Sequence, residues 1–256
     1  MSYDPIIFIA GMPRAGSMWT YNVCRSLIRA VGKQPWPEVV PQDESAAIRE
    51  ALSRPPLSGQ AYCIKTHFEI PLGKPHMRII CNYRDIRDAM LSFMRFTRCS
   101  FEKALAAARG SMKLTDHYLQ AGDRYVHPVN YEQMTSAPVE TIKAIAGFLS
   151  IDVSMEEVRR IAGDLSRESV QHRLEKLAAV EVDDSGRVSA EGKDGKLSSA
   201  MNQDGSFRVY DHETGFQSNH IGMHQDGEWR KVLSDAEQAE LMEAASDWLL
   251  RYGFRP

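Results

Sequence analysis

The chain has 256 residues, of which 43% are hydrophobic and 25% charged, which suits a globular protein with one substantial core or two small ones. Its formal net charge of -3 argues against a general nucleic-acid binder, and no apolar run is long enough to cross a membrane. The first residues lack the basic start and long apolar run of a signal peptide, and the four cysteines are widely spaced without a CxxC pair. We therefore expect a cytoplasmic protein with reduced cysteines and no metal site.

The first predicted elements are a buried strand over residues 6–10, a tight turn and a helix. Gly11 and Gly16 have the GxxxxG spacing of a phosphate-binding loop, a layout that points backbone N–H groups and a helix N-terminus at an anion. The Lys that usually follows the second glycine is absent: Ser17 stands there, and the basic residue of the loop is Arg14. The loop therefore fits a shorter anion chain than that of ATP. An ordinary strand-turn-helix with a surface Arg explains this stretch alone equally well.

Strands and helices alternate along the rest of the chain, which predicts a parallel sheet covered on both faces. The pattern predicts strands over residues 6–10, 61–65, 77–83 and 126–131, and helices over residues 18–31, 42–54, 89–96, 101–119 and 138–148. Ser154 and Ser234 each stand three residues before a Glu, the capping-box signature of two further helices. Residues 34–37, QPWP, predict a break that crosses the surface. We predict a P-loop-type three-layer α/β/α fold with a central parallel sheet, in a single domain over residues 1–256.

Residues 183–204 differ in composition from the rest. They are rich in Gly, Ser, Asp and Lys and poor in apolar residues, which predicts a flexible loop. A lid over a site and a plain surface loop both fit this composition.

Three polar clusters follow predicted strands, at residues 14–17, 65–67 and 84–88. Ligands of parallel α/β sheets bind beyond the C-terminal ends of the strands. The convergence of the three clusters at that edge predicts one active site.

The chemistry of these clusters suggests a base and an anion clamp. Lys65 and His67 lie two residues apart, on one side of an extended chain, and a His is the usual general base for a hydroxyl. Arg84 and Ser92 could both reach a phosphate oxygen. The alternatives are a structural His and a surface network in which the Arg and Asp side chains of residues 84–88 pair with one another.

Five stretches, in family order, resemble the sulfotransferases that use 3′-phosphoadenosine 5′-phosphosulfate (PAPS), and most closely the soluble cytosolic-type members. PRAGSMW resembles their 5′-phosphosulfate loop, IKTH their strand end with catalytic Lys and His, YRDIRDAMLSF their 3′-phosphate motif, NYEQM the segment whose Tyr approaches adenine, and GEWRKVLS the element before the last helices.

The resemblance implies sulfuryl transfer from PAPS to an acceptor hydroxyl or amine, with His67 as general base and Lys65 and Arg14 stabilising developing charge. It assigns cofactor binding to Arg14, Ala15, Gly16, Ser17, Met18, Trp19, Arg84, Ser92, Tyr131, His220, Ile221 and Gly222. It implies no metal and a small-molecule, lipid or glycan alcohol as acceptor, with no nucleic-acid partner and no membrane span. A homodimer stays open, because no stretch decides it.

The chain departs from the family pattern at three anion contacts. Met18 replaces a hydroxyl residue, which removes one possible phosphate contact, while Ser17 remains. Arg14 replaces the family Lys, which keeps the charge but cannot pass on a proton. The late Arg-Lys-Gly that grips the 3′-phosphate is absent, and residues 220–222 take the comparable place. Two other functions remain open: a P-loop phosphotransferase using ATP and magnesium, for which Asp85 is the tempting ligand, and a non-catalytic nucleotide-binding protein.

Overall fold

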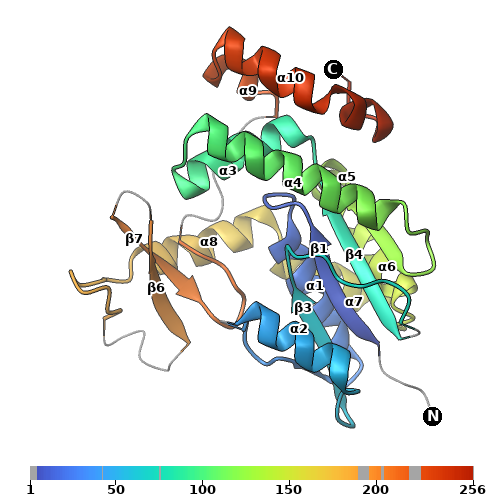
Figure 1. Cartoon of the computed structure of the whole chain (residues 1–256). Coiled ribbons are helices and arrows are strands. Elements are labelled where there is room, and N and C mark those ends of the chain that lie inside the picture. The colour runs from blue at the N-terminus through green and yellow to red at the C-terminus, as the bar shows by residue number, and fades with distance from the viewer. Residues whose placement is uncertain are drawn as a thin grey trace.

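The computed structural model describes residues 5–41, 43–74, 76–189, 196–202, 205–218 and 226–255. Its centre is a five-stranded sheet whose strands all run parallel, in the order β2-β3-β1-β4-β5 (Figure 1). The strands are β1 (Ile6–Gly11), β2 (Gln34–Trp36), β3 (Gln60–Lys65), β4 (Met77–Tyr83) and β5 (Val126–Asn130). The predicted parallel sheet is confirmed, and the apolar run of β1 takes its central position, buried at every residue.

Helices cover both faces of the sheet, because alternate residues of a strand point to opposite sides. In β1, Ile7 and Ile9 pack under one group of helices, and Phe8 and Ala10 under the other. The first group is α1 (Ser17–Ala30), α6 (Pro138–Phe148), α7 (Met155–Asp164) and α8 (Arg167–Ala178), and the second is α2 (Glu44–Ser53) and α4 (Phe101–Leu119). This arrangement confirms the predicted three-layer α/β/α fold.

A further apolar cluster attaches the C-terminal helices to the rest of the molecule. α3 (Ile86–Thr97) and α4 form this cluster with α9 (Trp229–Val232) and α10 (Asp235–Arg251), and Figure 1 shows α10 lying across α3 and α4. α10 begins at a full capping box, in which the Ser234 hydroxyl accepts from the Glu237 N–H and the Glu237 carboxylate accepts from the Ser234 N–H at 2.8 Å. None of the helices in the described part of the chain has the length and apolar character needed to cross a membrane.

Residues 34–37 are not the predicted surface break, because most of this stretch forms β2. Within the described part of the chain, β2 lies at the edge of the sheet and pairs with β3 alone. Pro35 fits there, since an edge strand needs hydrogen bonds on one side only and tolerates the missing N–H.

The predicted loop over residues 183–204 is also corrected in part. Its residues 197–201 form β6 (Leu197–Met201), which pairs antiparallel with β7 (Phe207–Asp211). The composition of residues 183–204 did not indicate this strand, because its partner β7 lies outside that range and an isolated strand is not stable by itself. Residues 190–195 and 203–204 lie outside the described residues. The base of the hairpin is tied to α1, since Asn22 Nδ2 donates to the Thr214 carbonyl at 2.9 Å.

Candidate active site

The loop between β1 and α1 has the backbone that its glycines predict. Gly11, Arg14 and Gly16 all have positive φ, at 108°, 65° and 84°. A Cβ on Gly11 would lie 2.3 Å from the Asn82 carbonyl oxygen, and a Cβ on Gly16 would lie 2.5 Å from the Met134 methyl carbon. Both positions therefore require glycine, and the loop leads directly into the N-terminus of α1.

The guanidinium of Arg14 is held by α3. Its Nε donates to Ser92 Oγ at 3.1 Å, and its central carbon lies 4.4 Å from the centre of the Phe96 ring. Ser92 and Phe96 are one helical turn apart, so they present one face to the loop. Burial lowers the pKa of Arg14 to about 10. The nearby Tyr131 raises this pKa and the charge of Arg84 lowers it, and the side chain stays protonated at neutral pH.

The imidazole of His67 is fixed in one tautomer by the end of β1. Its Nδ1 lies 3.0 Å from the Gly11 carbonyl oxygen, which can only accept a hydrogen bond. Nδ1 therefore carries the proton, and Nε2 keeps the lone pair that a general base needs. Burial, with the charges of Lys65 and Arg14, lowers the pKa of His67 to about 3, so the imidazole is neutral at neutral pH.

Lys65 shares this edge of the sheet with His67 and a carboxylate. Register pairs Lys65 with Ile9 of β1, which brings the end of β3 beside the phosphate-type loop. Burial lowers the pKa of the Lys65 ammonium, while Glu44 opposes the shift. Glu44, in the first turn of α2, also accepts a hydrogen bond from the His67 backbone N–H at 3.2 Å. The side chain of Glu44 thus ties α2 to the end of the strand that carries the predicted base.

Arg84 forms a second cationic position beside the loop. Its side chain is buried, and its central carbon lies 4.1 Å from the centre of the Tyr131 ring. Tyr131, the first residue of α5 (Tyr131–Ser136), also borders the space beside Gly16. Arg84 Nη2 donates to Asp226 Oδ1 at 2.8 Å, and Arg84 Nε has no hydrogen-bond partner among the described residues.

The surface network of neighbouring Arg and Asp side chains exists only in part. Asp85 caps α3 and binds Arg87, with Arg87 Nη2 to Asp85 Oδ2 at 2.6 Å. Asp88 instead accepts from the Gly227 N–H at 2.9 and 3.1 Å. Asp85 and Asp88 therefore have other partners than Arg84, and the Arg84 side chain lies beside the loop between β1 and α1.

The remaining predicted residues of the loop and of α1 have varied surroundings. Ala15 is buried among the apolar residues of α3 and α4, and Ser17 is buried at the start of α1. Met18 packs against the segment that follows β7. Trp19 donates its indole N–H to the Leu165 carbonyl at 3.1 Å and packs against the core on the α1 face.

Several contacts were missed from the sequence, and the predicted cofactor-binding residues His220, Ile221 and Gly222 cannot be compared with the structure. Residues 220–222 lie outside the described residues. Glu44, Phe96 and Asp226 were not predicted to contact the catalytic or cofactor-binding residues. Phe96 carried a signal, since it follows Ser92 by four positions on a helix. Glu44 and Asp226 carried none, because their contacts join segments distant in sequence.

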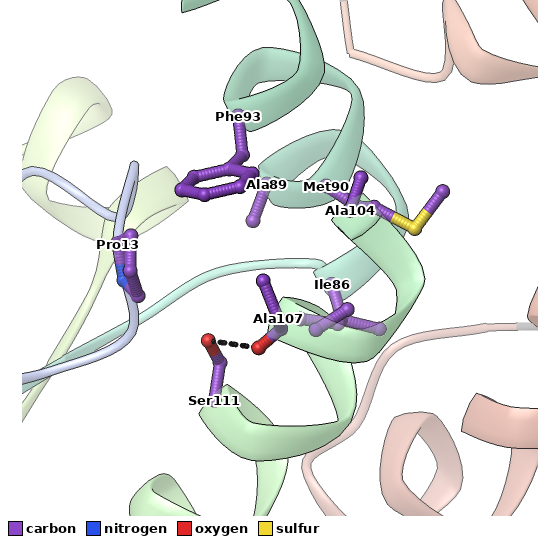
Figure 2. A pocket seen from close by; sticks show the side chains of 9 residues that line it. Pro13, Ile86, Ala89, Met90, Phe93, Ala104, Ala107 and Ser111 are labelled. Carbon is purple, nitrogen blue, oxygen red and sulfur yellow. Dashed lines mark hydrogen bonds between the residues drawn. The ribbon is translucent and has the colours of Figure 1, made fainter. Parts of the chain in front are cut away.

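An apolar pocket lies beside Pro13 of the loop, between α3 and α4 (Figure 2). Its lining is Pro13, Ile86, Ala89, Met90, Phe93, Ala104, Ala107, Ala108 and Ser111. The hydroxyl of Ser111 donates to the Ala107 carbonyl at 2.8 Å, so it offers little polarity to the space. The pocket holds about 10 Å³, enough for about one water molecule.

The fold and the site define a class: a P-loop-type α/β protein with two arginines and a Lys-His pair at the loop between β1 and α1. The chain matches the sulfotransferase domain over residues 4–180, more than half of its length, and it belongs to that family. The family match supports sulfuryl transfer as the general reaction. No curated protein sequence matches the chain.

Solved structures agree with this fold. A mouse sulfotransferase, SULT7A1, complexed with PAP, has a TM-score of 0.58 at 17% identity, covering 97% of this chain and 86% of that one. Retinol dehydratase in complex with androsterone and the inactive cofactor PAP has a TM-score of 0.57 at 16% identity, covering 95% and 80%. The same protein with retinol and PAP has a TM-score of 0.56 at 15% identity, covering 97% and 82%.

Proposed function

We propose that the chain transfers a sulfuryl group from PAPS to an acceptor hydroxyl, with His67 as general base. One observation carries this proposal: the Gly11 carbonyl holds His67 with Nε2 as its basic nitrogen, at the strand edge that also carries Lys65 and Arg14. The three solved structures with similar folds are complexes with PAP, the adenosine 3′,5′-bisphosphate that remains after PAPS gives up its sulfuryl group, which supports the choice of donor.

The residues present suit the two phosphate ends of this nucleotide. The backbone N–H groups of Gly16 and Ser17, at the start of α1, would bind the 5′-phosphate. Arg84 would bind the 3′-phosphate, because it is buried and its Nε lacks a partner among the described residues. Tyr131, which lies between Arg84 and the loop, would contact the adenosine.

The bound nucleotide supplies an electrophilic sulfur with a phosphate leaving group. His67 Nε2 takes the proton of the acceptor hydroxyl while the acceptor oxygen forms a bond to sulfur. The bond from sulfur to the bridging phosphate oxygen breaks, and that oxygen keeps the electron pair. Arg14 and Lys65 stabilise the negative charge on the sulfuryl oxygens and the leaving phosphate.

The low pKa of His67 suits a base that must be neutral before reaction. Burial contributes most to the shift, followed by the nearby charges of Lys65 and Arg14. An anion bound between these cations would offset their charge and raise the pKa of His67, so that it becomes more basic when the donor is present.

An apolar alcohol is the acceptor class that we favour. Phe68, which follows the predicted base His67 in the sequence, has an aromatic side chain that is 55% exposed and could pack against an apolar acceptor. One related structure was solved with retinol and another with androsterone, both apolar alcohols.

The first test is calorimetric titration with adenosine 3′,5′-bisphosphate, with magnesium-ATP as the competing ligand. We expect binding of the bisphosphate at micromolar concentration or below, weakened by Arg84→Ala. Binding of magnesium-ATP alone would instead support the phosphotransferase, for which the only tempting ligand, Asp85, already binds Arg87.

The second test is turnover of the His67→Ala variant with labelled PAPS and a panel of alcohols. We expect a loss of about 10²–10⁴ in kcat, the usual effect of removing a general base, which corresponds to about 3–6 kcal/mol. Binding of the bisphosphate should persist. Near-normal turnover in this variant would remove His67 from the base role.

A further inference from the structure

Arg84 already binds an anionic group of the chain itself. Its Nη2 donates to Asp226 Oδ1 at 2.8 Å, with the Arg84 side chain 6% and the Asp226 side chain 68% exposed. The Asp226 carboxylate therefore reaches from the solvent onto the guanidinium that would bind the 3′-phosphate.

The main chain next to Asp226 is anchored independently of this ion pair. The Gly227 N–H donates to both carboxylate oxygens of Asp88, at 2.9 and 3.1 Å, and Asp88 lies in the first turn of α3. Because this anchor does not involve the Asp226 side chain, the Asp226 carboxylate can leave Arg84 and enter water without breaking it.

Acidic groups surround Arg84 before any ligand binds. Asp88 and Glu132 interact electrostatically with Arg84, in addition to the direct contact of Asp226. A phosphate that binds Arg84 while Asp226 stays in place would meet like charge at close range. The phosphate and the Asp226 carboxylate therefore compete for the same guanidinium.

We propose that Asp226 is a specificity-determining residue that competes with the nucleotide 3′-phosphate for Arg84. This inference rests on the proposed function. Binding then exchanges one anionic partner of Arg84 for another, and release of the product returns Arg84 to Asp226. The competition lowers affinity only for nucleotides that carry a 3′-phosphate.

The experiment compares two nucleotides that differ in this one group. Calorimetric or competition titrations give the Kd of adenosine 3′,5′-bisphosphate and of adenosine 5′-monophosphate for the wild type and for Asp226→Asn. The Asn keeps the size and loses the charge. We expect the variant to bind the bisphosphate about fivefold more tightly, since a partly exposed ion pair contributes up to ~1 kcal/mol, and the monophosphate within about twofold of the wild type.

Two controls isolate the contact with Arg84. Asp184→Asn removes an exposed carboxylate of the same type before β6 and should leave both Kd values unchanged. In an Arg84→Ala background, Asp226→Asn should lose its effect on the bisphosphate, because the shared partner is gone.

The outcomes separate this inference from the proposed function. An equal gain for both nucleotides, or weaker binding of the bisphosphate, would overturn the competition; the second result would make Asp226 a residue that positions Arg84. A wild type that binds both nucleotides equally lacks the 3′-phosphate subsite, and the proposed function fails with it. A wild type that prefers the bisphosphate, with a preference that Asp226→Asn leaves unchanged, contradicts this inference alone.

Discussion

Arg14 shows how a single side chain can be oriented by a helix that it does not belong to. Its backbone has φ 65°, a conformation that residues other than glycine adopt at a cost in conformational energy. Its guanidinium is fixed by Ser92 and Phe96 of α3. Phe96 also lies under Arg208 of β7, with 5.3 Å between the Arg208 central carbon and the ring centre. The ring therefore connects the loop between β1 and α1 to the hairpin of β6 and β7.

We predict that Phe96→Leu lowers kcat about tenfold, because a cation over an aromatic ring contributes about 0.5–2 kcal/mol and Arg14 would lose its fixed orientation. Affinity for the bisphosphate should change little, since Phe96 is not expected to touch the nucleotide. Steady-state kinetics and calorimetry measure the two effects separately. The matched variant Phe96→Tyr keeps the ring and should retain turnover, whereas a loss equal to that of Leu would exclude the ring face as the cause.

For single residues, the sequence predicted which positions belong to the site better than it predicted which residues they contact. Gly11 and Gly16 could be assigned because only glycine allows their backbone and close approach. Ser92 was predicted as a phosphate contact, and the structure shows its hydroxyl on Arg14. Asp226 could not be assigned, because an exposed acidic residue has no pattern that reveals which cation it will meet.

Among the elements, helices with a local start signal were predicted well, and the strands β2, β6 and β7 were not. α10 begins where the capping box of Ser234 places it, because both hydrogen bonds lie within four residues. β2 depends on its pairing with β3, and β6 and β7 depend on each other, so the composition of each segment alone did not indicate a strand.

The cap of α10 gives a stability prediction. Ser234→Ala should lower the free energy of unfolding by about 1 kcal/mol, because the Glu237 N–H loses its acceptor at the start of the helix. Urea denaturation measures the change. Ser234→Asp, which can accept the same hydrogen bond, serves as the matched control and should recover most of the loss. An unchanged midpoint in the Ala variant would contradict the role of this cap.

For the whole molecule, the buried carboxyl of Asp88 makes stability depend on pH. Burial raises the pKa of Asp88 to about 6. The Gly227 N–H and the charge of Arg84 lower this pKa, and the charges of Asp85 and Asp226 raise it. The folded chain therefore holds this proton more tightly than the unfolded chain does. The carboxyl is neutral in both states well below pH 4, and its cost to stability grows as pH rises to about 6 and stays constant above it.

We predict that Asp88→Asn is more stable than the wild type at pH 8, by at most about 3 kcal/mol, at about 1.4 kcal/mol for each pKa unit. The Asn keeps an acceptor for the Gly227 N–H but cannot ionise. The advantage should shrink as pH falls and vanish near pH 4. Denaturant unfolding of both proteins at pH 4, 6 and 8 tests this, and a difference that does not vary with pH would refute the ionisation argument.

The packing of α9 and α10 on α3 has a consequence for biosynthesis. α3 carries Ser92 and Phe96, and its apolar residues share a cluster with Trp229, Leu241 and Trp248. When the ribosome has synthesised the chain as far as α4, the glycine loop, Lys65 and His67 are already present. The apolar face of α3 that packs against α9 and α10 is then still exposed to solvent. The apolar face of α3 is therefore covered only after α9 and α10 have emerged from the ribosome, and until then it is a natural target for a chaperone.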